Sequence, residues 1–167
     1  MEKVALSGTC YWCTEAIFQS LKGVSMVEQG WLALPDEDNV FTEGVIVHFD
    51  PDIISLKTLI EIHLHTHSST SNHSMRKKYR SAVYIYSDQQ RQIAQKALEE
   101  LQANFDKPLI TKVLSFQAFN SSDESIQNYY YTRPEKPFCT NIIAPKLRLL
   151  MEQFGSYTKG IKLKDQE

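Results

Sequence analysis

Two cysteines near the N-terminus, Cys10 and Cys13, have the residue type and spacing for nucleophilic or redox chemistry. They follow the apolar run Val4-Ala5-Leu6 and precede apolar residues at helical spacing, so a strand is predicted to end where a helix begins. The unpaired N–H groups and partial positive charge of a helix N-terminus favour a thiolate, the nucleophilic form of cysteine. Because about one helical turn separates them, Cys13 can reach the sulfur of Cys10. The pattern predicts a reactive cysteine with its own resolving partner.

The same pair has two other interpretations. The cysteines could be small buried hydrophobic residues at a helix start, or they could bind zinc together with Cys139 and a histidine. Several histidines also suggest a metal site, but only His63 and His67 would share one helix face, and the segment from 65 to 78 has the composition of a solvated loop. We therefore expect a redox or nucleophilic role and no metal.

The composition is that of an ordinary globular protein. The chain has 167 residues, of which 42% are apolar and 23% charged, enough for one domain with one core. Its net charge of −2 offers no general attraction to nucleic acid or anionic membranes, and no apolar window is long enough to span a bilayer. Three cysteines do not make a disulfide scaffold. We expect a soluble cytoplasmic monomer with one domain over residues 1–155 and a charged, flexible tail over 156–167.

The elements that must position the cysteines follow from periodicity and turn signals. Strands are predicted over about residues 3–8, 24–30, 43–49, 81–86 and 109–116. Helices are predicted over about 12–22, from 56 with Ser55 as N-cap, after Asp88 as cap, over 126–130 after Ser121, and from Pro145 to about Gly155. Pro134 and Pro137 favour a loop that contains Cys139. This alternation predicts an α+β fold, a mixed twisted sheet with a split βαβ (ferredoxin-like) core and helices packed on it.

The segment Thr9-Cys10-Tyr11-Trp12-Cys13-Thr14-Glu15-Ala16 is similar to the signature of the A-type peptide methionine sulfoxide reductases. That signature is Gly-Cys-Phe-Trp, then Gly or Cys, a variable residue, Glu and Ala. The resemblance covers about residues 3–150 in collinear order. It continues through Val47-His48-Phe49-Asp50-Pro51, Tyr79-Arg80-Ser81-Ala82, Gln90-Arg91, Gln127-Asn128-Tyr129-Tyr130, Pro137-Phe138-Cys139 and Ile143-Ala144-Pro145-Lys146-Leu147. The set is specific, although no single piece is decisive.

The resemblance implies a reaction and roles for the site residues. Cys10 would attack the sulfoxide sulfur, while Glu43 would protonate the sulfoxide oxygen and Tyr79 would hydrogen-bond it. The aromatic side chains of Tyr11 and Trp12 would hold the S-methyl group of the substrate. The implied substrate is methionine-S-sulfoxide, either in oxidised proteins or as the free amino acid.

The resemblance also implies how the nucleophile is regenerated. Methionine leaves, Cys10 becomes a sulfenic acid, and Cys13 condenses with it to form a disulfide. Thioredoxin or another dithiol would then reduce that disulfide by exchange, and no metal or organic cofactor is implied. Cys139 would either relay the disulfide outward or be a spare thiol.

The chain departs from the family pattern around these residues. Thr9 stands where the family has glycine, and Trp31 where it has a tyrosine that helps to bind the oxygen. The segment 32–42 is shorter than the glycine-rich loop of the family, His73-Ser74 replaces an Asn-Asp pair, and His63-Leu64-His65 replaces His-Asp-Pro. These departures concern substrate preference and rate more than reaction type.

Two other functions fit the same residues. One is a thiol–disulfide oxidoreductase that acts through Cys10 and Cys13 and does not need Glu43. The other is a divergent paralogue that binds methionine or sulfoxide segments without turning them over.

Overall fold

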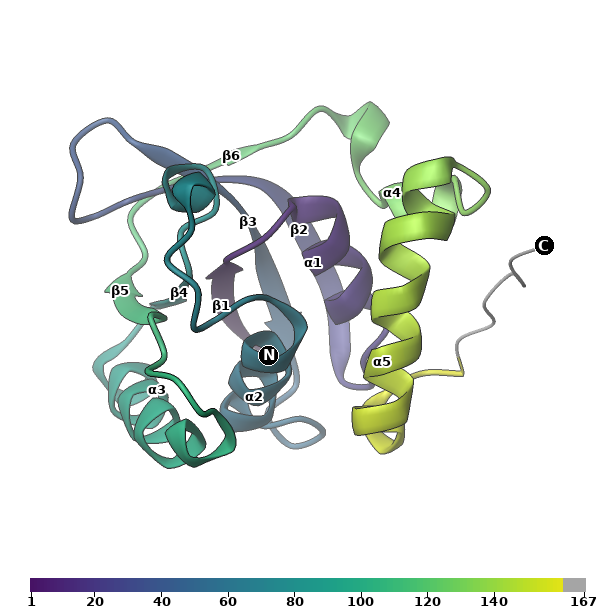
Figure 1. The fold of residues 1–167 in the computed structure, drawn as a ribbon. Coiled ribbons are helices and arrows are strands. Elements are labelled where there is room, and N and C mark those ends of the chain that lie inside the picture. The colour runs from purple at the N-terminus through teal and green to yellow at the C-terminus, as the bar shows by residue number, and fades with distance from the viewer. Residues whose placement is uncertain (161–167) are drawn as a thin grey trace.

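Six strands of the computed structural model, which describes residues 1–160, form one mixed sheet (Figure 1). The strands are β1 (Glu2–Ser7), β2 (Val24–Ala33), β3 (Phe41–Phe49), β4 (Ala82–Ile85), β5 (Lys112–Ser115) and β6 (Phe119–Ser121). Their order is β5-β4-β1-β3-β2-β6; β4 and β5 are parallel, and the other neighbours are antiparallel. The sheet is therefore mixed, as predicted.

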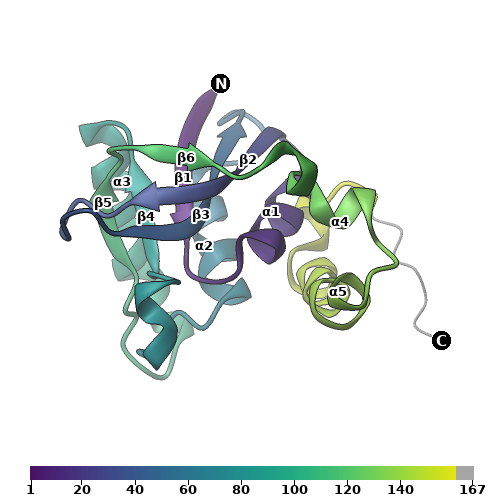
Figure 2. The same cartoon turned by 90° about the horizontal axis from the view of Figure 1, so that it is seen from above.

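The first four strands make the split βαβ arrangement. Helix α1 (Tyr11–Gln19) connects β1 to β2, and β3 lies between these two strands in the sheet. Helix α2 (Leu56–Thr66) then connects β3 to β4 on the other side of β1, and α3 (Asp88–Leu101) crosses from β4 to β5. Helix α5 (Ala144–Phe154) lies beside α1 (Figures 1 and 2). This arrangement confirms the predicted α+β class with a ferredoxin-like core.

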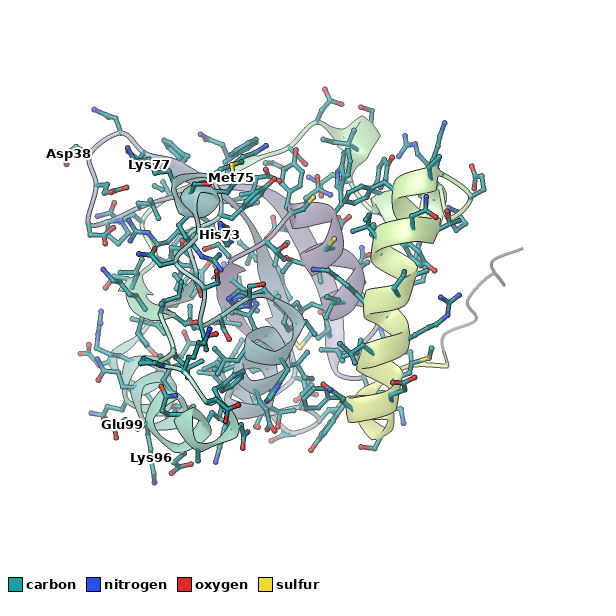
Figure 3. All side chains as sticks on the ribbon, in the orientation of Figure 1. Asp38, His73, Met75, Lys77, Lys96 and Glu99 are labelled. Atoms are coloured by element: carbon teal, nitrogen blue, oxygen red, sulfur yellow. The ribbon has the colours of Figure 1, made fainter. Side chains whose placement is uncertain are left out.

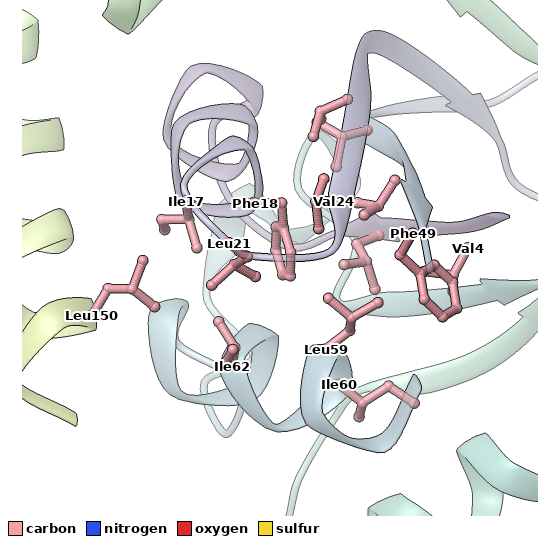
Figure 4. Packing of buried hydrophobic residues seen from close by; sticks show 14 of the residues in the cluster. Val4, Ile17, Phe18, Leu21, Val24, Phe49, Leu59, Ile60, Ile62 and Leu150 are labelled. Atoms are coloured by element: carbon pink, nitrogen blue, oxygen red, sulfur yellow. The ribbon is translucent and has the colours of Figure 1, made fainter. Parts of the chain in front are cut away.

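Alternate residues of the central strands face two different apolar clusters. Val4 and Leu6 point into the main core, which buried residues of α1, α2, α3 and α5 complete, as the close-up in Figure 4 shows for Phe18 and Leu59. Ala5, between them on β1, belongs to a smaller cluster on the other face. The helices thus cover one face of the sheet. No helix within residues 1–160 is long and apolar enough to cross a membrane.

Side-chain caps set the starts of α2 and α3. The Ser55 hydroxyl accepts a hydrogen bond from the Thr58 N–H at 3.1 Å, which confirms the predicted cap of α2. The prediction for α3 is wrong by one residue, because Ser87 accepts from the Gln90 N–H at 3.2 Å. Asp88 instead lies in the first turn, where its charge interacts favourably with the helix dipole.

The chain before α5 differs from expectation. The helix predicted over 126–130 is divided into a 3-10 turn (Glu124–Ile126) capped by Asp123 and the short helix α4 (Tyr129–Thr132). Asn128 separates them because it adopts a left-handed conformation with φ of 54°, which interrupts a right-handed helix.

The loop that Pro134 and Pro137 predicted around Cys139 is not present at that residue, so this prediction is wrong. Cys139 begins a π-helical turn (Cys139–Ile143) that continues directly into α5. Pro145 occupies the first turn of α5, as predicted, but it does not begin the helical chain, because the π-helical turn comes directly before it.

The chain after α5 is bonded to the end of α1. That helix ends at Gln19, earlier than predicted, and the Lys159 N–H donates to the carbonyl oxygen of Ser20 at 2.8 Å. The Lys22 N–H donates to the carbonyl oxygen of Tyr157 at 2.7 Å. The start of the predicted flexible tail is therefore held in place, and its residues 161–167 lie outside the described part of the chain.

Candidate active site

Cys10 is the N-cap residue of α1, shortly after the end of β1. Its carbonyl oxygen accepts hydrogen bonds from the N–H groups of Cys13 at 3.1 Å and Thr14 at 3.2 Å, so the helix begins at this residue. The Cys10 side chain is partly exposed, whereas Cys13 is buried, and both are free thiols. The structure thus places the predicted nucleophile within reach of solvent and its predicted partner one turn behind it.

The pKa values of the two thiols move in opposite directions. A hydrogen bond from the Cys13 thiol lowers the pKa of Cys10; burial opposes this shift, and the N–H groups of Trp12 and Cys13 add to it. The same hydrogen bond, together with burial, raises the pKa of Cys13. Cys10 therefore ionises first and Cys13 stays a protonated thiol.

Replacing Cys13 with alanine is expected to raise the pKa of Cys10, because it removes the hydrogen bond that contributes most to lowering it. The fraction of thiolate at a given pH falls, so the pH profile of Cys10 alkylation by iodoacetamide moves to higher pH. Cys13→Ser keeps a donor at that position and should move the profile less. An alkylation profile of Cys13→Ala that coincides with the wild-type profile would contradict this account.

Glu43 reaches the nucleophile from β3. The antiparallel register sets Ser7, at the end of β1, opposite Gly44, so Glu43 is level with the turn that leads to Cys10. Glu43 Oε1 accepts a hydrogen bond from the Tyr11 N–H at 3.3 Å, and the side chain is only 5% exposed. The predicted acid therefore lies at the first residue of α1, inside the site and shielded from solvent.

Tyr79 approaches the same place from the segment after α2. It follows a 3-10 turn (Ser74–Lys77) and donates its N–H to the carbonyl oxygen of Met75 at 3.0 Å. Burial and the negative charge of Glu43 raise the pKa of Tyr79, against the opposing effect of Lys78. The phenol therefore keeps its proton and is a hydrogen-bond donor, as its predicted role requires.

Aromatic rings gather around the start of α1. The ring centroid of Tyr11 lies 5.6 Å from that of Trp31 and 6.1 Å from that of Trp12. Trp12 stacks on Tyr129 at 4.0 Å and meets Phe138 edge-on at 5.4 Å. The structure brings the three predicted substrate-binding aromatics together and adds two that the sequence did not assign. Both lie in segments that resemble the family, but the resemblance was quoted for them without a role.

Glu15 is a buried site residue that the sequence analysis quoted in the signature but to which it gave no role. Its carboxylate accepts hydrogen bonds from the N–H groups of Asn128 at 2.9 Å and Tyr129 at 3.1 Å, and from Gln29 Nε2 at 2.9 Å. Burial raises the pKa of Glu15, and these donors lower it. The carboxylate joins α1 to the α4 segment and so holds Tyr129 against Trp12. A carboxylate among the apolar residues of a short helix was the available signal.

Arg76, also missed, joins the turn before the nucleophile to the segment that carries Tyr79. Its Nη1 donates to the carbonyl oxygens of Gly8 at 2.7 Å and Tyr79 at 2.8 Å. Its other donors bind the carbonyl oxygens of Ser68 at 2.5 Å and Ser71 at 2.8 Å. A guanidinium group that binds several backbone carbonyl oxygens at once fixes these two parts of the site relative to each other.

His63 and His67 have structural roles. His63 lies on α2, as predicted, and is buried; it donates to the carbonyl oxygen of Ser7 at 2.8 Å. The expectation of a solvated loop from residue 65 is wrong for His65, which still belongs to α2, and for the half-buried His67, which bonds to Ser81 at 2.7 Å. Desolvation lowers the pKa of His63 to about 4 and that of His67 well below its usual value, so both are neutral. A Cβ at Gly8 would lie 2.6 Å from the His67 ring, which explains the glycine there. Residues 1–160 hold no cluster of three metal-binding side chains.

Cys139 packs in the same buried cluster as Cys13, because the π-helical turn lies against α1. Burial raises the pKa of Cys139, so it is a protonated thiol out of contact with solvent. The three cysteines therefore run from the partly exposed Cys10 inward to Cys13 and its neighbour Cys139.

A cavity of about 470 Å³ adjoins the nucleophile. Thr9, which directly precedes Cys10 in the chain, and Tyr79 line it together with His73 and Lys146. Cys10 and the aromatic rings of α1 are not among its lining residues. The cavity therefore lies beside the Cys10 sulfur and does not enclose it.

A family model described as "Peptide methionine sulfoxide reductase" matches residues 2–158. The chain belongs to this family. It is 33% identical over 170 residues to the peptide methionine sulfoxide reductase MsrA of a Nitratiruptor species, with 93% of this chain and 98% of the relative covered. It is 32% identical over 171 residues to MsrA of Chromobacterium violaceum, with 93% and 97% covered. The predicted family and its enzyme class, an oxidoreductase acting on methionine sulfoxide, are confirmed.

Solved structures of the family share the fold. The reduced form of Mxr1 from Saccharomyces cerevisiae superposes with a TM-score of 0.73 at 20% identity, covering 83% of this chain and 88% of that one. Mxr1 in complex with Trx2 superposes with a TM-score of 0.60 at 22% identity, covering 77% and 84%. At this identity the likeness supports the fold, and the roles of individual residues must be argued from their own geometry.

Proposed function

We propose that this chain reduces methionine-S-sulfoxide, in proteins and as the free amino acid, through a sulfenic acid on Cys10 and a Cys10–Cys13 disulfide. One observation carries the proposal: a partly exposed thiol of lowered pKa lies at a helix N-cap, hydrogen-bonded to a second, buried thiol. A metal or organic cofactor is not needed for any step. Family membership supplies the reaction type, and the arrangement of side chains supports the assignment of roles.

In the first step, the Cys10 thiolate attacks the sulfoxide sulfur. A bond forms between the two sulfur atoms, while an electron pair of the S–O bond moves to the oxygen, which takes a proton from Glu43. The hydroxyl then transfers to the Cys10 sulfur, and the bond between the two sulfur atoms breaks with its electron pair staying on the methionine sulfur. Methionine leaves as a thioether, and Cys10 is oxidised by two electrons to a sulfenic acid. Tyr79, as a protonated phenol beside Glu43, would hydrogen-bond the oxygen during this transfer.

The substrate is held by apolar contact and by its single polar oxygen. Tyr11, Trp12 and Trp31 present rings around the start of α1, where they would contact the S-methyl group. Trp31 pairs with Glu43 across the β2–β3 ladder, so the apolar wall and the acid lie next to each other. This placement favours a small apolar group next to a hydrogen-bonded oxygen, which is the shape of a methyl sulfoxide.

In the second step, the Cys13 thiol attacks the sulfenic acid, water leaves, and a Cys10–Cys13 disulfide forms. Thioredoxin would reduce this disulfide by exchange, an assignment supported by the solved complex of the relative Mxr1 with Trx2. Cys139, which packs in the same cluster as Cys13, is the candidate for a relay cysteine. Because Cys139 is buried, the π-helical turn that carries it would have to move before thioredoxin could reach its sulfur.

A Cys13→Ser variant separates the two steps. It is expected to release one equivalent of methionine per reduced enzyme, because Cys10 is intact, but to lose about 100-fold or more in steady-state turnover with thioredoxin. Cys139→Ser is the matched thiol-to-hydroxyl control and leaves the first equivalent unchanged. Sustained wild-type turnover of Cys13→Ser with thioredoxin would refute its resolving role.

A further inference from the structure

The main chain of Lys78 is hydrogen-bonded to β3 at Glu43, the proposed acid. The Lys78 carbonyl oxygen accepts hydrogen bonds from the Glu43 N–H at 3.1 Å and from the Thr42 hydroxyl at 2.6 Å. Its own N–H donates to the carbonyl oxygen of Met75 at 3.1 Å. Because these bonds fix the main chain on both sides, the Lys78 side chain starts from a defined position next to Glu43.

The Lys78 ammonium group lies between the two groups that would bind the sulfoxide oxygen. Its Nζ atom is 3.4 Å from Glu43 Oε2 and 5.3 Å from the ring centroid of Tyr79. The Lys78 side chain is 49% exposed, whereas that of Glu43 is 5% exposed, so the ammonium covers the carboxyl group at the mouth of the site. A hydrogen bond with Tyr79 and the charge of ionised Glu43 raise the pKa of Lys78. Because a lysine is cationic at neutral pH even without this shift, the ammonium keeps its charge when Glu43 is protonated.

We propose that Lys78 is a further catalytic residue, whose ammonium group donates a hydrogen bond to the sulfoxide oxygen and stabilises the negative charge that develops there. This inference rests on the proposed function. As the Cys10–sulfur bond forms, the S–O electron pair moves to the oxygen, which receives its proton from Glu43. Lys78 keeps its own protons and supplies a fixed positive charge. Such a charge stabilises the transition state more than the neutral sulfoxide of the ground state.

A purely structural ion pair is the alternative. An ion pair with one exposed member contributes little to stability because water screens it, so removing it would leave both folding and activity nearly unchanged. An ammonium group that touches the substrate oxygen would instead affect the rate of the first chemical step. The two interpretations therefore differ in a measurable rate.

The test uses single-turnover release of N-acetylmethionine from its S-sulfoxide by the reduced full-length chain at pH 7. Lys78→Met, which removes the charge, is expected to slow release by about 10- to 100-fold. Lys78→Arg keeps a cation, so its release rate should stay within about threefold of the wild-type rate. Lys78→Gln keeps a hydrogen-bond donor but no charge, and its release rate should be well below that of Lys78→Arg. Lys77→Met is the matched control: it removes an exposed lysine of the neighbouring 3-10 turn, labelled near Met75 in Figure 3, and should change the rate by less than about twofold.

Cys10 alkylation by iodoacetamide, measured in every variant, should stay within about twofold of wild type, since Lys78 acts on the oxygen and not on the thiol. The proposal is overturned if Lys78→Met releases the product at the rate of Lys77→Met, or if Lys78→Arg is no faster than Lys78→Gln. It is also overturned if alkylation falls as much as product release. If the wild-type chain releases no product, the proposed function itself fails, so the two failures are distinguishable.

Discussion

Replacing Cys10 with serine is expected to abolish methionine release, with a loss of about 10⁴-fold or more in the single-turnover rate. A serine hydroxyl is not ionised at neutral pH and cannot form the sulfenic acid that receives the oxygen. The helix start and the Cys13 hydrogen bond, which lower the pKa of the thiol, cannot compensate for the change of atom. The measurement is quantification of methionine released per reduced chain, without added reductant.

Cys139→Ser is the control for the Cys10 variant, because it replaces a buried thiol with the same side chain away from the reacting atoms. It should release methionine at the wild-type rate in the first turnover. Release from Cys10→Ser at more than about one hundredth of the wild-type rate would show that another group attacks the sulfoxide.

Replacing Glu43 with glutamine is expected to slow methionine release by about 10²- to 10⁴-fold. The amide oxygen can still accept the hydrogen bond from the Tyr11 N–H, so the local structure is kept while the acid is lost. In its ionised form Glu43 raises the pKa of Cys10, so its removal lowers that pKa. Alkylation of Cys10 should therefore be as fast as in wild type or faster, while sulfoxide reduction falls. These opposite changes distinguish the reactivity of the thiol from the acid-assisted reduction of the sulfoxide.

Glu28→Gln provides the matched control for this carboxyl-to-amide change. Glu28 lies on β2 and bonds to His48 at 2.8 Å, outside the group of residues around Cys10. The Glu28→Gln variant should release methionine at the wild-type rate. Wild-type release from Glu43→Gln would instead favour a thiol–disulfide oxidoreductase that works through the cysteines alone.

The central fold was predictable because its signals are local. The short apolar runs of β1 and β3, and the Ser55 cap of α2, are signals that each segment carries by itself. The weaker predictions lie after Leu109. Strand β6 spans only Phe119–Ser121, and α4 is interrupted by the left-handed Asn128, so neither has enough residues to produce a periodic pattern.

The parts of the site that could be predicted are those whose residues lie close together in the sequence. The cysteine pair at a helix start could be recognised from neighbouring residues, whereas Glu43 and Tyr79 were found only through the resemblance to a family. The roles of Glu15 and Arg76 were missed because their partners lie up to 114 and 68 residues away in the chain. Nothing in the residues around Glu15 or Arg76 indicates which backbone groups they will bind, since tertiary packing decides that.

The most direct test of the account is the amount of methionine that the reduced wild-type chain releases from each sulfoxide epimer, without added reductant, together with the mass of the oxidised product. We expect one equivalent of methionine from the S epimer, none from the R epimer, and a protein lighter by two hydrogens through a Cys10–Cys13 disulfide. Release of methionine from neither epimer, or an equal yield of methionine from both with Cys10 unmodified, would contradict the proposed mechanism.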